Sequence, residues 1–131
     1  MTASTAKRKI VNVRDPAAFR PFDRYGKAIP GFSWIPISFD LARGEGSYLL
    51  RIEAGARSLP HEHTGFEEFL VLDGTLQDHD GTHYRAGDFV TFLPGSRHWS
   101  VSPGGCTLAV FMRGPNRPLD AAEVAALEGK G

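Results

Sequence analysis

Four side chains of the types that bind divalent metal ions stand at suggestive spacings: His61, His63, Glu67 and His98. The first two histidines are separated by one residue in a stretch expected to form a strand, so their side chains project from the same face. Glu67 follows beyond a Thr-Gly pair, where the chain can bend and bring the carboxylate back. Three neutral imidazoles and one carboxylate are suitable ligands for Fe, Mn, Co, Ni or Zn.

Other reactive residue types are interpreted more simply. His79 and His83 flank an Asp-Gly pair and are expected to be exposed turn residues rather than a second metal site. Glu68 is expected to be a solvated strand carboxylate, and Trp99 a packing residue facing away from His98. Cys106 alternates with apolar residues, which predicts a buried and inert thiol. Several aromatic residues could line a pocket or fill the core: Trp34, Tyr48, Phe69 and Phe111.

The elements that must position these side chains are short strands. From residue 32 onward, β-branched and aromatic runs alternate with Gly and Pro, which predicts about ten strands. Two Asp-Gly pairs, Asp73-Gly74 and Asp80-Gly81, predict hairpin turns. The expected strands cover residues 32–39, 47–53, 57–63, 67–72, 75–79, 82–85, 88–93, 97–101 and 106–112. The fold class is therefore all-β.

One helix is expected near the end of the chain, over residues 121–128. Asp120 and Glu123 are spaced as a capping box, and Gly129 suits a helix stop. Residues 1–9 are predicted to be a flexible tail, and residues 14–31 a connection with little regular structure. We expect residues 10–131 to form a single domain.

Composition excludes several classes of function. The 131 residues include 15 basic and 15 acidic side chains, so neither a nucleic-acid footprint nor a polybasic membrane patch is expected. A single cysteine excludes an internal disulfide framework and a multi-cysteine zinc site. No apolar run is long enough to span a bilayer, and residues 1–9 lack the apolar region of a secretory signal. A soluble cytoplasmic protein is expected.

Glycine spacing around the four candidate ligands resembles the cupin superfamily. Residues 55–74 match the pattern G-x5-H-x-H-x3-E-x6-G, and residues 87–98 resemble G-x5-P-x-G-x2-H. The resemblance covers about residues 45–112. It implies a double-stranded β-helix, or jelly-roll, barrel with the metal inside. The short helix expected from the capping residues would follow this barrel at the C-terminus. The resemblance also implies that the metal ligands are His61, His63, Glu67 and His98.

A narrower resemblance is to the ChrR-type cupin domain. It rests on the segments LPHEHTGFEEFLVLDGTLQDHDGTHYRAGD and LPGSRHWSVSPGGCTL. That group includes the zinc-holding domain of an anti-sigma factor, and it is similar to small cupin dioxygenases that cleave β-diketones or hydroxyaryl ketones. The acetylacetone-cleaving members use three histidines, so Glu67 is a departure from them. The roughly 40 residues before the barrel lack a helical zinc-binding pattern, so this chain alone is not expected to act as an anti-sigma factor.

The function expected from the resemblance is a metal-dependent dioxygenase acting on a small ketone, diketone or phenolic compound. One divalent metal per chain is expected, Fe(II) or Zn(II) before Mn, Ni or Co. Four ligands in an octahedral shell leave two positions open, and Glu67 could take a substrate proton. Two alternatives stay open: a non-catalytic zinc-binding sensor module with a closed tetrahedral site, and a zinc-dependent cyclase or isomerase.

The expected partners are a small-molecule substrate or ligand and a second copy of the chain. Residues 32–39 are apolar, and an exposed apolar strand edge invites pairing. The sequence therefore predicts a homodimer formed through this segment.

Overall fold

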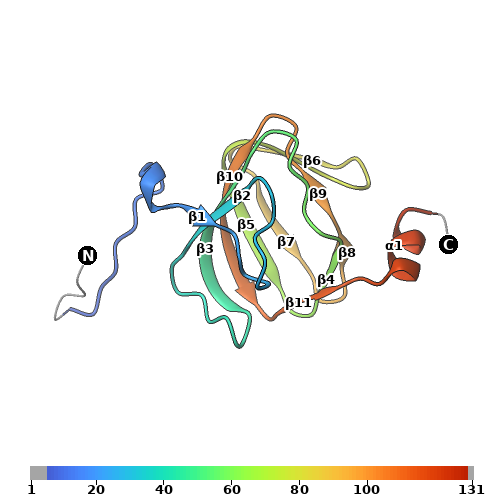
Figure 1. Ribbon diagram of the computed structural model, residues 1–131, viewed down its shortest axis with the longest axis horizontal. Helices are drawn as coiled ribbons and strands as arrows, with labels where there is room; N and C mark the ends of the chain where they lie inside the picture. The colour runs from blue at the N-terminus through green and yellow to red at the C-terminus, as the bar shows by residue number, and fades with distance from the viewer. Residues whose placement is uncertain (1–5, 130–131) are drawn as a thin grey trace.

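The structure is a computed structural model that describes residues 6–129, so the first five residues of the expected tail lie outside the described part. Two antiparallel sheets curl around a common interior to form the expected cupin barrel (Figure 1). The strands are β1 (Arg20–Pro21), β2 (Phe32–Pro36), β3 (Glu45–Ile52), β4 (His61–His63), β5 (Glu67–Asp78), β6 (His83–Arg85), β7 (Phe89–Phe92), β8 (Arg97–His98), β9 (Ser100–Val101), β10 (Cys106–Arg113) and β11 (Asn116–Pro118).

Strand β5 joins the two halves of the larger sheet. The sheet runs β1-β2-β3-β10-β5-β6, with β7 and β9 also paired to β5, and a three-stranded sheet runs β11-β4-β8. The expected hairpin at Asp73-Gly74 is wrong, because β5 continues through it. Gly74 instead pairs with Cys106 of β10, two residues after a bulge at Leu72; its φ is 76°, and its backbone packs against Gly105 too closely for a Cβ. The second pair, Asp80-Gly81, does form the turn between β5 and β6.

Alternation along the strands sets the core. Phe69 and Val71 of β5 point inward and are buried, whereas Leu72 is 37% exposed on the outer face. A continuous apolar cluster fills the interior: Phe22, Ile29, Phe32, Trp34, Tyr48, Leu50, Ile52, Phe69, Val71, Leu76, Cys106, Leu108, Val110 and Met112.

The sequence predicted that residues 32–39 leave an exposed apolar edge for dimer formation, and the structure corrects this expectation. Phe32, Trp34 and Ile35 are all buried, and β2 pairs with β1 on one side and β3 on the other. The large apolar side chains of this strand are therefore buried within the chain and do not form the exposed apolar edge that was expected. The segment before it is also more regular than expected, since it contains a 3-10 helix, η1 (Pro16–Ala18), and β1.

The C-terminal helix α1 (Ala121–Leu127) confirms the sequence prediction. Its capping box is complete: the Asp120 side chain accepts from Glu123 N–H, and the Glu123 carboxylate accepts from Asp120 N–H. Ion pairs from Glu123 to Arg117 and Arg97, at 2.6 and 2.9 Å, fix the helix against β11 and β8.

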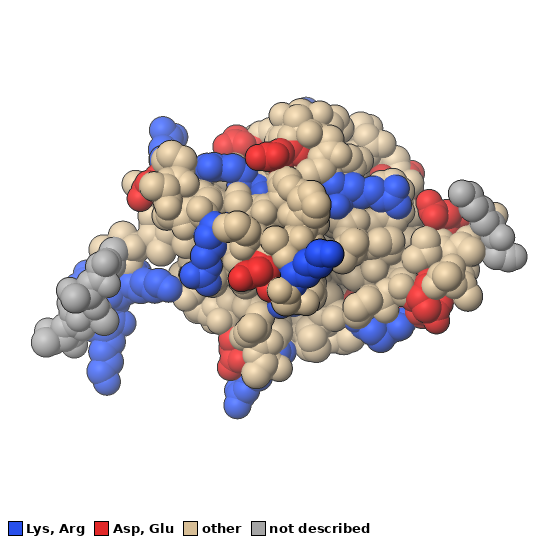
Figure 2. Space-filling model, in the orientation of Figure 1, with Lys and Arg blue, Asp and Glu red and all other residues tan. Residues whose placement is uncertain are grey.

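The described helices include none that is long and apolar enough to cross a membrane. Figure 2 shows basic and acidic side chains interspersed over one face of the molecule, with no field of a single sign.

Candidate metal centre

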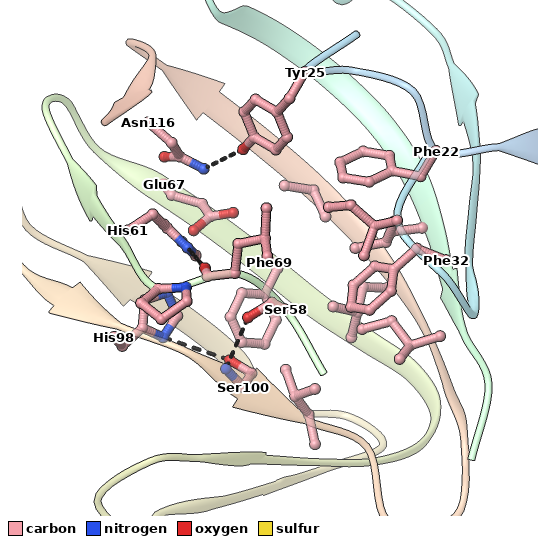
Figure 3. A pocket seen from close by; sticks show the side chains of 18 of the residues that line it. Phe22, Tyr25, Phe32, Ser58, His61, Glu67, Phe69, His98, Ser100 and Asn116 are labelled. Carbon is pink, nitrogen blue, oxygen red and sulfur yellow. Dashed lines mark hydrogen bonds between the residues drawn. The ribbon is translucent and has the colours of Figure 1, made fainter. Parts of the chain in front are cut away.

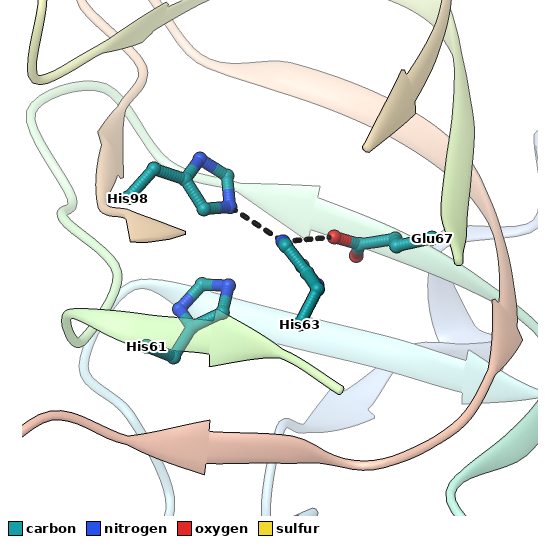
Figure 4. Close-up of side chains that lie close together, drawn as sticks. All are labelled: His61, His63, Glu67 and His98. Atoms are coloured by element: carbon teal, nitrogen blue, oxygen red, sulfur yellow. Dashed lines mark hydrogen bonds and ion pairs between the residues drawn. The ribbon is translucent and has the colours of Figure 1, made fainter. Parts of the chain in front are cut away.

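Backbone pairing brings the four candidate ligands together. His61 and His63 lie on β4 and project to the same side, as the spacing predicted. β8 pairs with β4 so that His98 lies opposite His61. Between β4 and β5 the chain bends at Gly65, whose backbone contacts that of Arg113 with no space for a Cβ. This bend returns Glu67 to the histidines (Figure 4).

The ligand atoms converge closely. One atom from each of the four side chains lies within 4.8 Å of all the others. His63 Nε2 is 2.9 Å from both His98 Nε2 and a Glu67 carboxylate oxygen. His63, Glu67 and His98 are buried, with exposed fractions of 0%, 9% and 5%. The cluster is therefore a preformed group of donors at the barrel interior.

Each imidazole is oriented by a hydrogen bond from its other nitrogen. His61 Nδ1–H donates to the Leu59 carbonyl at 2.7 Å. His98 Nδ1–H donates to Asp78 at 3.0 Å, and His63 Nδ1–H donates to the Asn116 side-chain oxygen at 2.9 Å. A hydrogen on Nδ1 leaves a lone pair on Nε2, so all three histidines present lone pairs to one point.

The surroundings of the cluster shift the pKa values of His61 and Glu67 so that each is deprotonated at neutral pH, as metal binding requires. Burial lowers the pKa of His61 to about 4, and the neighbouring His98 acts in the same direction. Burial alone would raise the pKa of Glu67, but the contact with His63 and the proximity of the other imidazoles, which take up protons more readily than the carboxylate, outweigh burial and lower that pKa to about 2. At neutral pH the cluster thus offers a neutral His61 and an ionised carboxylate.

The donor set fits a divalent metal ion. Three nitrogen lone pairs and a carboxylate repel one another unless a cation lies among them. These are the ligand types that bind zinc, iron and related metals. We therefore describe His61, His63, Glu67 and His98 as a group that can hold a metal ion.

A cavity of about 150 Å³ opens beside the cluster. His61, Glu67 and His98 form part of its wall, and the rest is largely aromatic and aliphatic (Figure 3). Of the aromatics that could line a pocket, Tyr48 and Phe69 do so. Trp34 packs in the core outside this lining, and Phe111 is 41% exposed on the outer face.

The remaining candidates behave as structural residues. Within residues 6–129, neither His79 nor His83 belongs to a metal-binding group. His83 is exposed as expected, whereas His79 is only partly exposed and lies beside the ring of Trp99. Trp99 packs under the guanidinium of Arg57, which lies 3.6 Å from its ring centroid. Cys106 is buried, as expected, and burial raises the pKa of its thiol.

Glu68 is only partly exposed and is not simply solvated. It accepts from Thr91 and pairs with Arg113 on the outer face of the sheet.

Two functional residues were not found from the sequence. Asp78 accepts from His98 and also from Tyr84 and Ser100, at 2.6 and 2.8 Å. Asn116 orients His63 from β11. Inward alternation along β5 could have indicated Asp78, but nothing in the local sequence marks Asn116.

Comparison with known proteins shows the family to which this chain belongs. The profile of the ChrR Cupin-like domain matches residues 16–115, which include all four candidate ligands. This chain belongs to the ChrR cupin-like family. A search of curated proteins found no significant match.

Solved structures share the fold of this ChrR cupin-like chain. An acetylacetone dioxygenase from Acinetobacter johnsonii has a TM-score of 0.74 at 18% identity, covering 88% of this chain and 80% of that one. The polyketide cyclase RemF from Streptomyces resistomycificus has a TM-score of 0.64 at 18% identity, covering 92% and 93%.

A third similar structure is the Rhodobacter sphaeroides complex of SigE with the anti-sigma ChrR. It has a TM-score of 0.55 at 26% identity, covering 76% of this chain and 49% of that chain. This ChrR cupin-like chain therefore corresponds to about half of that protein. At these identities the two enzyme structures show a shared fold, and function has to be argued from the site.

Proposed function

We propose that this chain is a metal-dependent dioxygenase acting on a small ketone, diketone or phenolic compound. Its metal, Fe(II), would be held by His61, His63, Glu67 and His98. The observation that carries the proposal is the convergence of three imidazole lone pairs and one carboxylate on the wall of an apolar cavity. A structural metal would not require a cavity beside it.

The four side chains could hold the metal and leave room for a ligand. His61, His63, Glu67 and His98 would supply four donor atoms. If Fe(II) bound there took its common six-coordinate form, two positions would stay open for substrate or O₂.

Cavity size and chemistry define the substrate class. An apolar cavity of about 150 Å³ can take a molecule of benzene size, and the cavity here has about that volume. Phe32, Leu50 and Val110 are among its apolar walls. A substrate should therefore place its oxygen atoms at the metal end and a short alkyl or single-ring body among the apolar side chains.

Different residues of the chain would orient the ligands, accept a proton and exclude water. When bound, Fe(II) supplies Lewis acidity and a redox centre that can react with O₂. Asp78 and Asn116 hold two of the ligand rings in register. Glu67 is the one carboxylate among the residues lining the cavity, so it is the group placed to accept a proton from an acidic substrate carbon. The apolar walls exclude water from the reacting atoms.

Two further functions remain as alternatives. A metal-dependent cyclase or isomerase could use the same cavity without O₂, and the match to RemF over nearly the whole of both chains favours this option as the second candidate. A zinc-binding sensor module is favoured only by the family profile and the match to ChrR.

The test is O₂ consumption by protein stripped of metal and reloaded anaerobically with Fe(II). We expect O₂ uptake on addition of a β-diketone or hydroxyaryl ketone. The zinc-loaded protein and the His98→Ala variant should show none, while His79→Ala should retain the activity. No substrate-dependent uptake by the Fe(II) protein across a panel of such compounds would overturn the dioxygenase proposal.

A further inference from the structure

Tyr25 places a hydroxyl group at the rim of the cavity. It lies in the loop between β1 and β2, lines the cavity and is 45% exposed. Its ring packs edge-on against Phe22, and the Arg24 guanidinium lies 5.1 Å from its centroid. Figure 3 shows its hydroxyl directed to Asn116, on the same side of the cavity as Glu67 and His61.

The Tyr25 hydroxyl is linked to the metal cluster through one amide. Asn116 accepts from His63 Nδ1 through its oxygen and donates from its NH₂ group to the Tyr25 oxygen at 3.0 Å. The order His63–Asn116–Tyr25 therefore connects a ligand ring on β4 to a loop residue at the cavity mouth.

A metal on His63 Nε2 allows only one direction for these hydrogen bonds. With Nε2 bound to metal, the ring hydrogen must be on Nδ1, so the Asn116 oxygen must face His63. The NH₂ group then faces Tyr25, and the phenol oxygen must accept. The hydroxyl hydrogen of Tyr25 consequently points away from Asn116.

That hydrogen has no acceptor among the described residues, where the hydroxyl makes only the bond from Asn116. The phenol also stays protonated at neutral pH, because burial raises its pKa above the ordinary value of 10.0 against the smaller opposing effect of Arg24. A neutral O–H group is thus free to donate to a molecule bound in the cavity that Tyr25 lines.

We propose that the Tyr25 hydroxyl donates a hydrogen bond to an oxygen atom of the ligand bound to the metal. Tyr25 would thereby select ligands that keep a free lone pair on the side of the β1–β2 loop. Enolate, carboxylate and ketone oxygens meet this requirement, whereas a nitrogen ligand with no further acceptor does not. The inference rests on the proposed metal site but not on oxygenase chemistry.

The experiment compares two probes on the Co(II)-loaded protein without O₂ chemistry. Acetate binds metal through one oxygen and keeps a second as acceptor, whereas imidazole binds through nitrogen and offers only N–H. Both are titrated by their effect on the visible Co(II) spectrum. Tyr25→Phe should weaken acetate binding about tenfold, equivalent to about 1.4 kcal/mol. Imidazole affinity, Co(II) affinity and melting temperature should stay unchanged.

Two results would overturn the inference: equal acetate affinity in both proteins, or equal weakening of both probes, which would indicate a structural effect of Tyr25. Failure of the wild-type protein to bind either probe would contradict the open coordination position itself. If Tyr25→Phe selectively loses acetate binding and the Fe(II) protein shows no O₂ uptake, the hydrogen-bonding role of Tyr25 would be supported. Only the proposed dioxygenase function would then be rejected.

Discussion

At the residue scale, the site depends on hydrogen bonds that reach the ligands from distant parts of the chain. His98 is held by Asp78, and His63 by Asn116, at 3.0 and 2.9 Å. Such partners fix the tautomer and the ring orientation of a ligand histidine, and their loss commonly weakens metal binding by about 10- to 100-fold. Two of the candidate ligand rings are therefore oriented by hydrogen bonds in the absence of a metal.

Removing a ligand should remove the metal. We predict that His98→Ala retains less than a tenth of the wild-type metal affinity, because three donors remain and the carboxylate of Asp78 loses its partner. Elemental analysis after dialysis measures this. His79→Ala is the matched control and should keep full occupancy, since His79 lies outside the cluster. Equal occupancy in both variants would reject the four-ligand site.

The four candidate ligands could be picked out from the sequence because their spacing follows the period of a strand and a glycine frame. His61 and His63 lie two residues apart on β4, and Glu67 follows the bend at Gly65. Asp78 and Asn116 could not be predicted in the same way. Their contacts depend on strand pairing across 20 and 53 residues, which no local pattern encodes.

Acidification should destabilise the metal-free protein. The folded pKa of His61 is about 4, below the ordinary value of 6.5, so between these values the unfolded chain binds more protons. Stability is thus greatest above pH 6.5 and falls toward pH 4, by at most about 3 kcal/mol from this residue.

Melting temperatures of the metal-free protein between pH 7.5 and pH 4 would measure this loss. The His61→Gln variant should show a flatter profile because it lacks the titrating ring. Parallel profiles for the two proteins would show that His61 does not carry the effect.

At the element scale, β5 is the strand on which both the barrel and the site depend. Its first half supplies Glu67 and Phe69 to the cavity, and its second half supplies Asp78 behind His98. The sequence predicted most strands and the capped helix correctly, because alternation and capping are local signals. It misread Asp73-Gly74, since a glycine with a positive φ also fits within a strand next to a bulge, here the one at Leu72.

Substitution of Gly74, next to the bulge, should be costly. Gly74→Ala combines a positive φ with a Cβ that would overlap Gly105, so we predict a loss of about 2 kcal/mol or more. Gly81→Ala is the matched control: its φ is 89°, but nothing lies within 4 Å of the added Cβ. Urea denaturation should show a clearly smaller loss for the control, and equal losses would contradict the role of close packing at Gly74.

At the scale of the whole molecule, exposed apolar side chains lie on the outer face of the larger sheet. Residues 32–39, which were expected to expose apolar side chains, bury them instead. Phe89 of β7 and Phe111 of β10 are 58% and 41% exposed and stack with their centroids 6.2 Å apart. Leu72 of β5 is exposed on the same sheet. An apolar patch of this kind is self-complementary and suits pairing about a twofold axis.

We predict a homodimer that uses this face. Light scattering on the wild-type protein at micromolar concentration should give twice the chain mass of 14.3 kDa. The Phe89→Ser and Phe111→Ser double variant should give the monomer mass, while Leu41→Ser, which changes a residue elsewhere that is 64% exposed, should remain dimeric. A monomeric wild-type protein would refute the prediction.

The central claim is that His61, His63, Glu67 and His98 hold one metal ion with open positions facing the cavity. The visible spectrum of the Co(II)-loaded protein tests it most directly, because coordination number governs the intensity of the Co(II) bands. The account predicts one Co(II) per chain with weak bands of a six-coordinate ion, which change when a β-diketone is added. Intense tetrahedral bands that do not respond to any added ligand would contradict it.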